Sequence, residues 1–319
     1  MARLDETGII ELFVKTLGHP KSPFSRIGDD VPYFPSSGDL TVLKSDMLVA
    51  KTDVPKQMKL WQASRKSVIM CASDMLVKGA TPLCFMLSLG IPRTYKTGDI
   101  RDLAKGVKMA RDELGIEFVG GDTNECDDLV IDCTMLGSAK SIVTRAGAHV
   151  GDAVYVSGEF GLTPSGLKIL QKGFEASAEF KERALQSVLM PKVKTNFASI
   201  IRDYATASID SSDGLALSLH QIVESSNVEI ELEELPFAKG VKEFAKANNT
   251  NADTLVLYGG EEYEMVFCVN RENTAKVERA CKELGHRAIR IGVVKKGSGV
   301  FLNGSKVERK GWIHFKSHI

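Results

Sequence analysis

The chain lacks the features that would tie it to a membrane, a nucleic acid or a zinc ion. No apolar run approaches the ~20 residues needed to span a bilayer, and the formal net charge is zero, so no basic field exists for a nucleic-acid backbone. The 6 cysteines include no Cys-x-x-Cys pair, which argues against a zinc site. Scattered thiols in a chain of this size are typical of reduced core residues. We expect a soluble, cytoplasmic protein with neither a nucleic-acid nor a membrane partner.

The common nucleotide-binding motifs are also missing. A P-loop needs Gly-x-x-x-x-Gly-Lys-Ser/Thr, and the nearest approach, at residues 161–168, has Leu167 at the lysine position. The His-Arg-Asp and Asp-Phe-Gly triplets of protein kinases do not occur. If the chain binds a nucleotide, metal ions held by carboxylates must therefore do most of the work on its phosphates.

Length and composition predict two domains. The chain has 319 residues, which is longer than a domain with a single hydrophobic core usually is. Turn-rich segments at 145–147 and 151–152 separate two sets of expected strands and helices. We therefore expect an N-terminal domain at residues 1–150 and a C-terminal domain at residues 151–319. Strands and helices are mixed without a strict βαβ order, which favours an α+β architecture with antiparallel or mixed sheets.

Hydrophobic periodicity and turn residues predict the main elements. We expect an N-terminal amphipathic helix, a long loop at 18–38 and a strand at 40–45 that ends at Asp46. Further helices are expected at 58–79, 99–114, 164–170, 178–190, 193–204, 215–225 and 273–284. Further strands are expected at 116–119, 129–138, 152–157, 207–210, 228–232, 265–269 and 288–294, before a terminal hairpin.

Five short acidic motifs lie where an expected element meets a loop. They are Gly28-Asp29-Asp30, Ser45-Asp46, Ser73-Asp74, Gly120-Gly121-Asp122-Thr123 and Asp210-Ser211-Ser212-Asp213-Gly214. Taken singly, such motifs are ordinary in turns and helix caps, because Asp and Ser bond local backbone donors. Carboxylates gathered from distant segments suit several hard divalent cations, and such cations suit a polyphosphate. The set therefore predicts a Mg²⁺-dependent phosphoryl-transfer enzyme.

Asp74 is the hardest of these residues to explain without a cation. It lies within an otherwise apolar stretch of an expected helix, next to Met75 and Leu76. A carboxylate buried there is costly unless a positive charge accompanies it. We therefore expect Asp74 to lie at the metal site.

Seven motifs in a fixed order resemble a known family. They are Ile-Gly-Asp-Asp at 27–30, Ser-Asp at 45–46, Ala-Ser-Asp at 72–74 with Gly-Ala at 79–80, Gly-Gly-Asp-Thr at 120–123, Thr-Arg-x-Gly-Ala at 144–148, Ile-Asp-x-Ser-Asp-Gly at 209–214 and Gly-Gly-Glu-Glu-Tyr at 259–263. This chain is similar to the thiamine-monophosphate kinases, within the superfamily of aminoimidazole ribonucleotide synthetase and selenophosphate synthetase. The resemblance implies ATP-dependent phosphorylation of thiamine monophosphate by direct transfer of the γ-phosphoryl group. It also implies a homodimer whose N-terminal sheets close into a barrel, a C-terminal α/β sandwich-like domain, and an active site between the domains.

The resemblance also implies site residues. For several Mg²⁺ ions it implies the ligands Asp30, Ser45, Asp46, Asp74, Asp122, Asp210 and Asp213. For ATP it implies Gly121, Asp122, Arg145 and Ser212, and for the thiamine moiety Asp53, Glu261 and Trp312. It implies no catalytic side chain beyond metal-assisted transfer. The residues also allow plainer roles: a surface ion pair for Arg145, an N-cap for Asp213 and core packing for Trp312.

Departures from the family pattern keep alternatives open. Asp53 stands where bacterial members often have His, and Glu262 replaces the usual Asp. These differences leave room for a kinase of another phosphorylated acceptor, and a non-catalytic nucleotide sensor is a second alternative. A selenophosphate synthetase normally has a reactive N-terminal Cys or selenocysteine, and residues 1–70 contain no Cys. A hydrogenase-maturation protein ends in Cys, whereas this sequence ends in Ile319.

Overall fold

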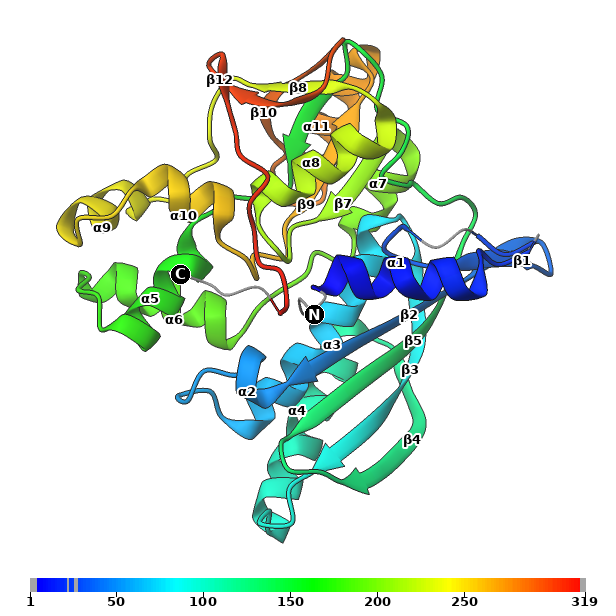
Figure 1. The fold of residues 1–319 in the computed structure, drawn as a ribbon, viewed down its shortest axis with the longest axis vertical. Coiled ribbons are helices and arrows are strands. Elements are labelled where there is room, and N and C mark those ends of the chain that lie inside the picture. The colour runs from blue at the N-terminus through cyan, green and yellow to red at the C-terminus, as the bar shows by residue number, and fades with distance from the viewer. Residues whose placement is uncertain (1–4, 22, 26–27, 316–319) are drawn as a thin grey trace.

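The computed structural model describes residues 5–21, 23–25 and 28–315, folded around two β-sheets (Figure 1). The first sheet, in the lower half of Figure 1, has the order β1-β2-β5-β3-β4, and the second, in the upper half, has the order β12-β11-β8-β10-β6-β9-β7. The expected mixed α+β fold is confirmed. Among the helices of these residues, none is long and apolar enough to cross a membrane.

The first sheet pairs five strands, of which only β3 and β4 run parallel. Its strands are β1 (Tyr33–Ser36), β2 (Asp39–Val49), β3 (Thr81–Ile91), β4 (Glu117–Glu125) and β5 (Val130–Ala139). Helix α3 (Leu60–Val77) packs on β2 and β5, and α4 (Thr97–Leu114) packs on α3. The amphipathic helix α1 (Glu6–Leu17) precedes β1, and the short helix α2 (Ala50–Asp53) follows β2.

The second sheet is antiparallel except where β8 and β11 pair. Its strands are β6 (Ala153–Val156), β7 (Ala205–Asp210), β8 (Glu229–Leu232), β9 (Met265–Val269), β10 (Ile289–Lys295), β11 (Gly299–Leu302) and β12 (Ser305–Lys306). The accompanying helices are α5 (Leu162–Lys172), α6 (Ala178–Leu189), α7 (Phe197–Tyr204), α8 (Leu215–Ser226), α9 (Val241–Ala247), α10 (Ala252–Tyr258) and α11 (Thr274–Glu283), with a 3₁₀ turn at Arg271–Asn273.

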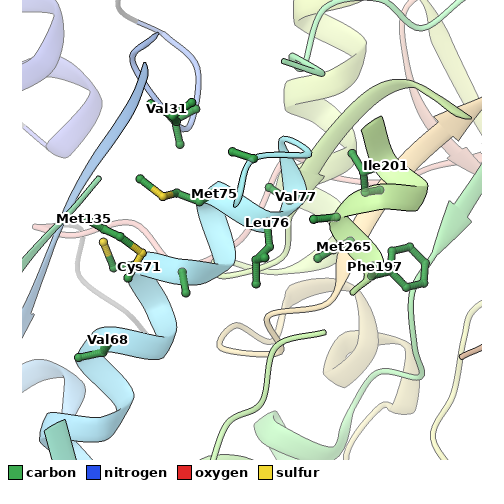
Figure 2. Packing of buried hydrophobic residues seen from close by; sticks show 14 of the residues in the cluster. Val31, Val68, Cys71, Met75, Leu76, Val77, Met135, Phe197, Ile201 and Met265 are labelled. Atoms are coloured by element: carbon green, nitrogen blue, oxygen red, sulfur yellow. The ribbon is translucent and has the colours of Figure 1, made fainter. Parts of the chain in front are cut away.

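Helix α3 is the shared core element of the two sheets. Figure 2 shows Cys71 on the side of Met135 from β5, and Leu76 facing Phe197 of α7 and Met265 of β9. All five of these side chains are buried in one cluster. Residues from both sides of position 150 contribute to this cluster, so the two sheets pack against each other through a shared core. The division into domains at 1–150 and 151–319 stays a prediction.

Several element boundaries differ from the sequence-based expectations. Asp46 lies inside β2 rather than at its end, and Gly120 and Gly121 lie inside β4 rather than in a turn. Part of the expected loop at 18–38 is strand β1, which pairs with β2. Strand β3 was not expected, because Pro82 indicated a break. In the structure Pro82 lies at the start of the strand beside a register shift, where a missing amide hydrogen is tolerated.

Candidate active site

A cavity of about 790 Å³ opens between elements of the two sheets. β2 and α3 line it on one side, and the end of β7, helix α8 and the segment before β9 line it on the other. Ten of the expected site residues line it: Asp30, Asp46, Asp53, Asp74, Arg145, Asp210, Ser212, Asp213, Glu261 and Trp312. Ser45, Gly121 and Asp122 do not line it. The fold thus gathers residues that are far apart in the sequence at one polar cavity.

Three carboxylates form the acidic centre of the cavity. Asp74 projects from the buried helix α3, and its Oδ2 lies 2.5 Å from Lys44 Nζ. Asp210 ends β7, and its Oδ2 accepts a 2.7 Å hydrogen bond from Ser73. Burial and the repulsion of neighbouring carboxylates raise the pKa of Asp74 well above its ordinary value, and that of Asp210 to about 6. Burial, with other carboxylates nearby, raises the pKa of Asp46 as well. Such a cluster favours additional positive charge.

The donor set fits Mg²⁺. Within the described ranges, no three His, Cys, Asp or Glu side chains converge as a complete metal-binding group. Mg²⁺ commonly takes only one or two carboxylates and completes its shell with water and phosphate oxygens. Asp46, Asp74 and Asp210 supply hard oxygen donors in a setting that favours cations, so they are the residues that would hold it.

Asp30 has a different environment from these three. The buried Lys78 Nζ lies 2.7 Å from Asp30 Oδ2 and 2.8 Å from Asp29 Oδ1, and Arg145 Nε donates to Asp30 Oδ1 at 3.0 Å. Burial would raise the pKa of Asp30, but Lys78 and Arg145 outweigh it and hold the pKa at about 2. Asp30 therefore anchors the Arg145 guanidinium at the cavity, where its planar fork suits a phosphate.

The expected thiamine-side residues lie on separate segments. Asp53 Oδ2 accepts a 2.7 Å hydrogen bond from the amide of Val49. This bond links the N-cap residue of helix α2 to the last residue of the helix. Glu261 has a φ of +63°, and its amide donates to the Ser212 carbonyl at 2.6 Å. Trp312 is 39% exposed and lines the cavity, and its ring meets the His314 ring edge-on with 5.9 Å between the ring centroids.

Ser45 and Asp122 lie elsewhere in the first sheet. Ser45 Oγ donates to Asp132 Oδ1 at 2.6 Å, away from the cavity. Paired positions run across the sheet from Asp46 through Cys133 and Leu87 to Gly121. Three strand spacings therefore separate Asp46 from Gly121, or roughly 14 Å. Ser45, Gly121 and Asp122 are thus not brought to the cavity, and the binding roles of all the expected site residues stay predictions.

The sequence interpretation missed three lysines at this site. Lys44 contacts Asp74, Lys78 contacts Asp29 and Asp30, and Lys66 contacts Glu261. Lys66 and Lys78 are fully buried in or directly after α3. A charged side chain in an apolar helical stretch is the signal that identified Asp74. The same signal in the sequence could have identified Lys66 and Lys78.

Glu262 anchors the segment that carries Glu261. Its carboxyl oxygens accept hydrogen bonds from the Gly161 amide and, at 3.1 Å, from Thr163 Oγ1. Burial raises the pKa of Glu262 from 4.5 to about 8. The folded protein therefore keeps a proton on this group at pH values where the unfolded chain has lost it.

We expect Glu262→Gln to remove a pH-dependent loss of stability. Between pH 4.5 and about 8 the unfolded carboxyl is ionised and the folded one is not, so the free energy of unfolding falls as pH rises. Because part of the side chain reaches solvent, we expect the variant to gain about 2 kcal/mol over wild type across this range. Urea denaturation at several pH values measures it, with the exposed Glu243→Gln as control. A difference independent of pH would mean that folded Glu262 is ionised.

Comparisons with known proteins agree over nearly the whole chain. The family models for AIR synthase related protein match at residues 28–139 (N-terminal domain) and 149–304 (C-terminal domain). The thiamine-monophosphate kinase of Nitrosopumilus maritimus is 36% identical over 320 residues, 99% of this chain and 100% of that protein. The one from Aquifex aeolicus is 31% identical over 317 residues, 99% of each chain.

Solved structures of other proteins also match this chain over nearly its whole length. The structure described as AaThiL complexed with AMPPCP and TMP has a TM-score of 0.89 and 30% identity, and the match covers 99% of both chains. The hydrogenase maturation protein HypE of E. coli has a TM-score of 0.70 at 21% identity, over 94% of this chain and 95% of that one. The likeness to HypE shows a common fold only.

Proposed function

Because this chain belongs to the AIR synthase related family, and within it to the thiamine-monophosphate kinases, we propose that it phosphorylates thiamine monophosphate to thiamine diphosphate with ATP. The observation that carries the proposal is one cavity lined by two unlike sets of side chains. Buried carboxylates and Arg145 suit metal ions and phosphate, and Glu261 and Trp312 suit an aromatic cation.

The residues suit transfer between two anions. An oxygen of the acceptor phosphate attacks the γ-phosphorus of ATP, and the bond to the β-phosphate oxygen breaks to release ADP. Several Mg²⁺ ions, when bound, neutralise the repulsion between the two phosphate groups. Asp46, Asp74 and Asp210 would hold these ions, and Arg145 and Ser212 would position ATP. An acceptor phosphate is largely ionised near neutral pH, so no strong general base is required.

We propose that the active unit is a homodimer. The first sheet leaves apolar side chains exposed on β2, β3, β4 and β5: Leu43, Met47, Leu83, Met86, Val119 and Leu136. An exposed apolar surface of this kind marks an interaction site. Pairing two such sheets would bury it and bring Gly121 and Asp122 of one copy toward the cavity of the other. The 1–150 part would then serve dimerisation and the metal site, and the 151–319 part would complete the cavity.

We also propose a cytoplasmic location. All 6 cysteines are free, as expected where thiols stay reduced.

A kinase assay tests the proposed function. We expect purified protein with ATP, Mg²⁺ and thiamine monophosphate to form thiamine diphosphate and ADP in equal amounts, and to form neither without Mg²⁺. Chromatography that resolves the two thiamine phosphates measures this. ATP binding without thiamine diphosphate would refute the proposed acceptor and favour another phosphorylated substrate or a nucleotide sensor.

A further inference from the structure

Lys66 is a buried cation whose two partners line the cavity and are the residues expected to meet the thiamine moiety. The side chain projects from α3 and is 0% exposed. Its Nζ donates to the Asp53 carbonyl at 2.9 Å and forms an ion pair with Glu261 Oε1. A buried ammonium is tolerated only where ion pairs and hydrogen bonds replace its lost hydration. Lys66 itself does not line the cavity, whereas both of its partners do.

The two partners come from distant parts of the chain. Asp53 ends helix α2, directly after the first sheet's strand β2, and Glu261 lies between α10 and β9 of the second sheet. One ammonium group therefore connects a segment on each side of the cavity. Neighbouring Arg65 is also buried, but it bonds to Glu113 and the Pro191 carbonyl. A variant that lacks Arg65 therefore loses a buried cation of α3 but keeps the connection that Lys66 makes across the cavity.

Glu261 needs such an external support. Its φ of +63° is a left-handed conformation that a side-chain-bearing residue adopts at a cost. The hydrogen bond from its amide to Ser212 holds the backbone, and Lys66 holds the carboxylate through Oε1. The Glu261 side chain keeps 26% of its surface exposed, so the carboxylate still faces the cavity.

We propose that Lys66 is a positioning residue that sets recognition of the thiamine moiety without touching it. Its ammonium fixes the positions of the Glu261 carboxylate and the Asp53 backbone. Both residues are therefore already oriented when the acceptor binds. The inference rests on the proposed function and names a determinant of acceptor affinity within that site. Lys44, Lys78 and Arg145 pair instead with Asp74, Asp29 and Asp30, so we expect loss of Lys66 to act mainly on the acceptor.

Steady-state kinetics of the full-length enzyme test this role. We expect Lys66→Met to raise KM for thiamine monophosphate about tenfold or more, which is what one charged hydrogen bond contributes, while KM for ATP stays within about twofold. Glu261→Gln is expected to raise the same KM. Because Lys66 acts largely through Glu261, adding Lys66→Met to Glu261→Gln is expected to raise it by much less than tenfold.

Arg65→Met is the matched control. We expect it to lower the melting temperature with little change in KM for thiamine monophosphate, as a purely structural buried cation would. Unchanged acceptor KM in Lys66→Met, or equal rises in both KM values, would overturn the positioning role. Absence of turnover in the wild type would instead refute the proposed function. If Lys66→Met does not fold, Lys66→Arg, which keeps the charge and displaces it, is expected to show the same selective rise.

Discussion

Asp74→Asn is expected to abolish phosphoryl transfer while leaving the protein folded. Asp74 projects from the core helix α3 into the cavity beside Asp46 and Asp210, and Lys44 is its ion-pair partner. Asparagine keeps the shape but removes the anionic oxygen that would bind Mg²⁺. We expect kcat to fall roughly a thousandfold, in line with several kcal/mol of lost charge stabilisation. Because burial and the neighbouring carboxylates raise the pKa of Asp74, removing its charge relieves the cluster, and we expect the variant to stay folded although Lys44 loses its ion-pair partner.

Product formation and thermal unfolding of the purified variant measure these two effects separately. Asp203→Asn is a suitable control, because Asp203 is exposed and its ion-pair partner is its neighbour Arg202 in α7. We expect that control to keep wild-type turnover. Wild-type turnover in a well-folded Asp74→Asn variant would contradict the assignment of Asp74 to the metal site.

The fold was predictable where each element carries its own pattern. Strand β9 is a continuous apolar run, and its bounds at 265–269 agree with the structure. The glycines of β4 were harder, because the reason for them lies in a neighbouring strand. A side chain at Gly121 would meet the Leu87 carbonyl oxygen at 1.8 Å, so glycine here permits close approach to β3. A single strand's sequence does not reveal such a requirement.

The sequence interpretation included the acidic residues of the candidate site and Arg145, but not its lysines. Acidic motifs beside small residues stand out along the chain, whereas Lys44 lies in an ordinary alternating strand. Its pairing with Asp74 arises only when β2 packs on α3. The identity of an ion-pair partner is a property of the folded chain. For that reason the sequence indicated where negative charge gathers but not which protein cations already balance it.

A second large effect is expected from mixing two inactive variants. If Asp122 acts in the cavity of the partner copy, Asp122→Asn is inactive as a pure dimer, as is Asp74→Asn. A mixed dimer then holds one cavity in which both residues are intact. Random pairing of equal amounts makes about half of the dimers mixed, so we expect about a quarter of wild-type activity to return. The exposed position of Asp122 on edge strand β4, outside its own cavity, is the reason to expect this result.

The matched control mixes Asp74→Asn with Asp46→Asn. Both residues line the same cavity of one chain, so every cavity in such a mixed dimer retains one defect and no activity is expected to return. Native mass spectrometry after co-refolding confirms that mixed dimers form, and the kinase assay is then run on the same samples. Mixed Asp74→Asn and Asp122→Asn dimers without activity would place Asp122 outside the partner's site. Wild-type turnover in Asp122→Asn alone would remove it from the catalytic machinery. Recovery in the first mixture alone requires that each cavity be built from two copies of the chain.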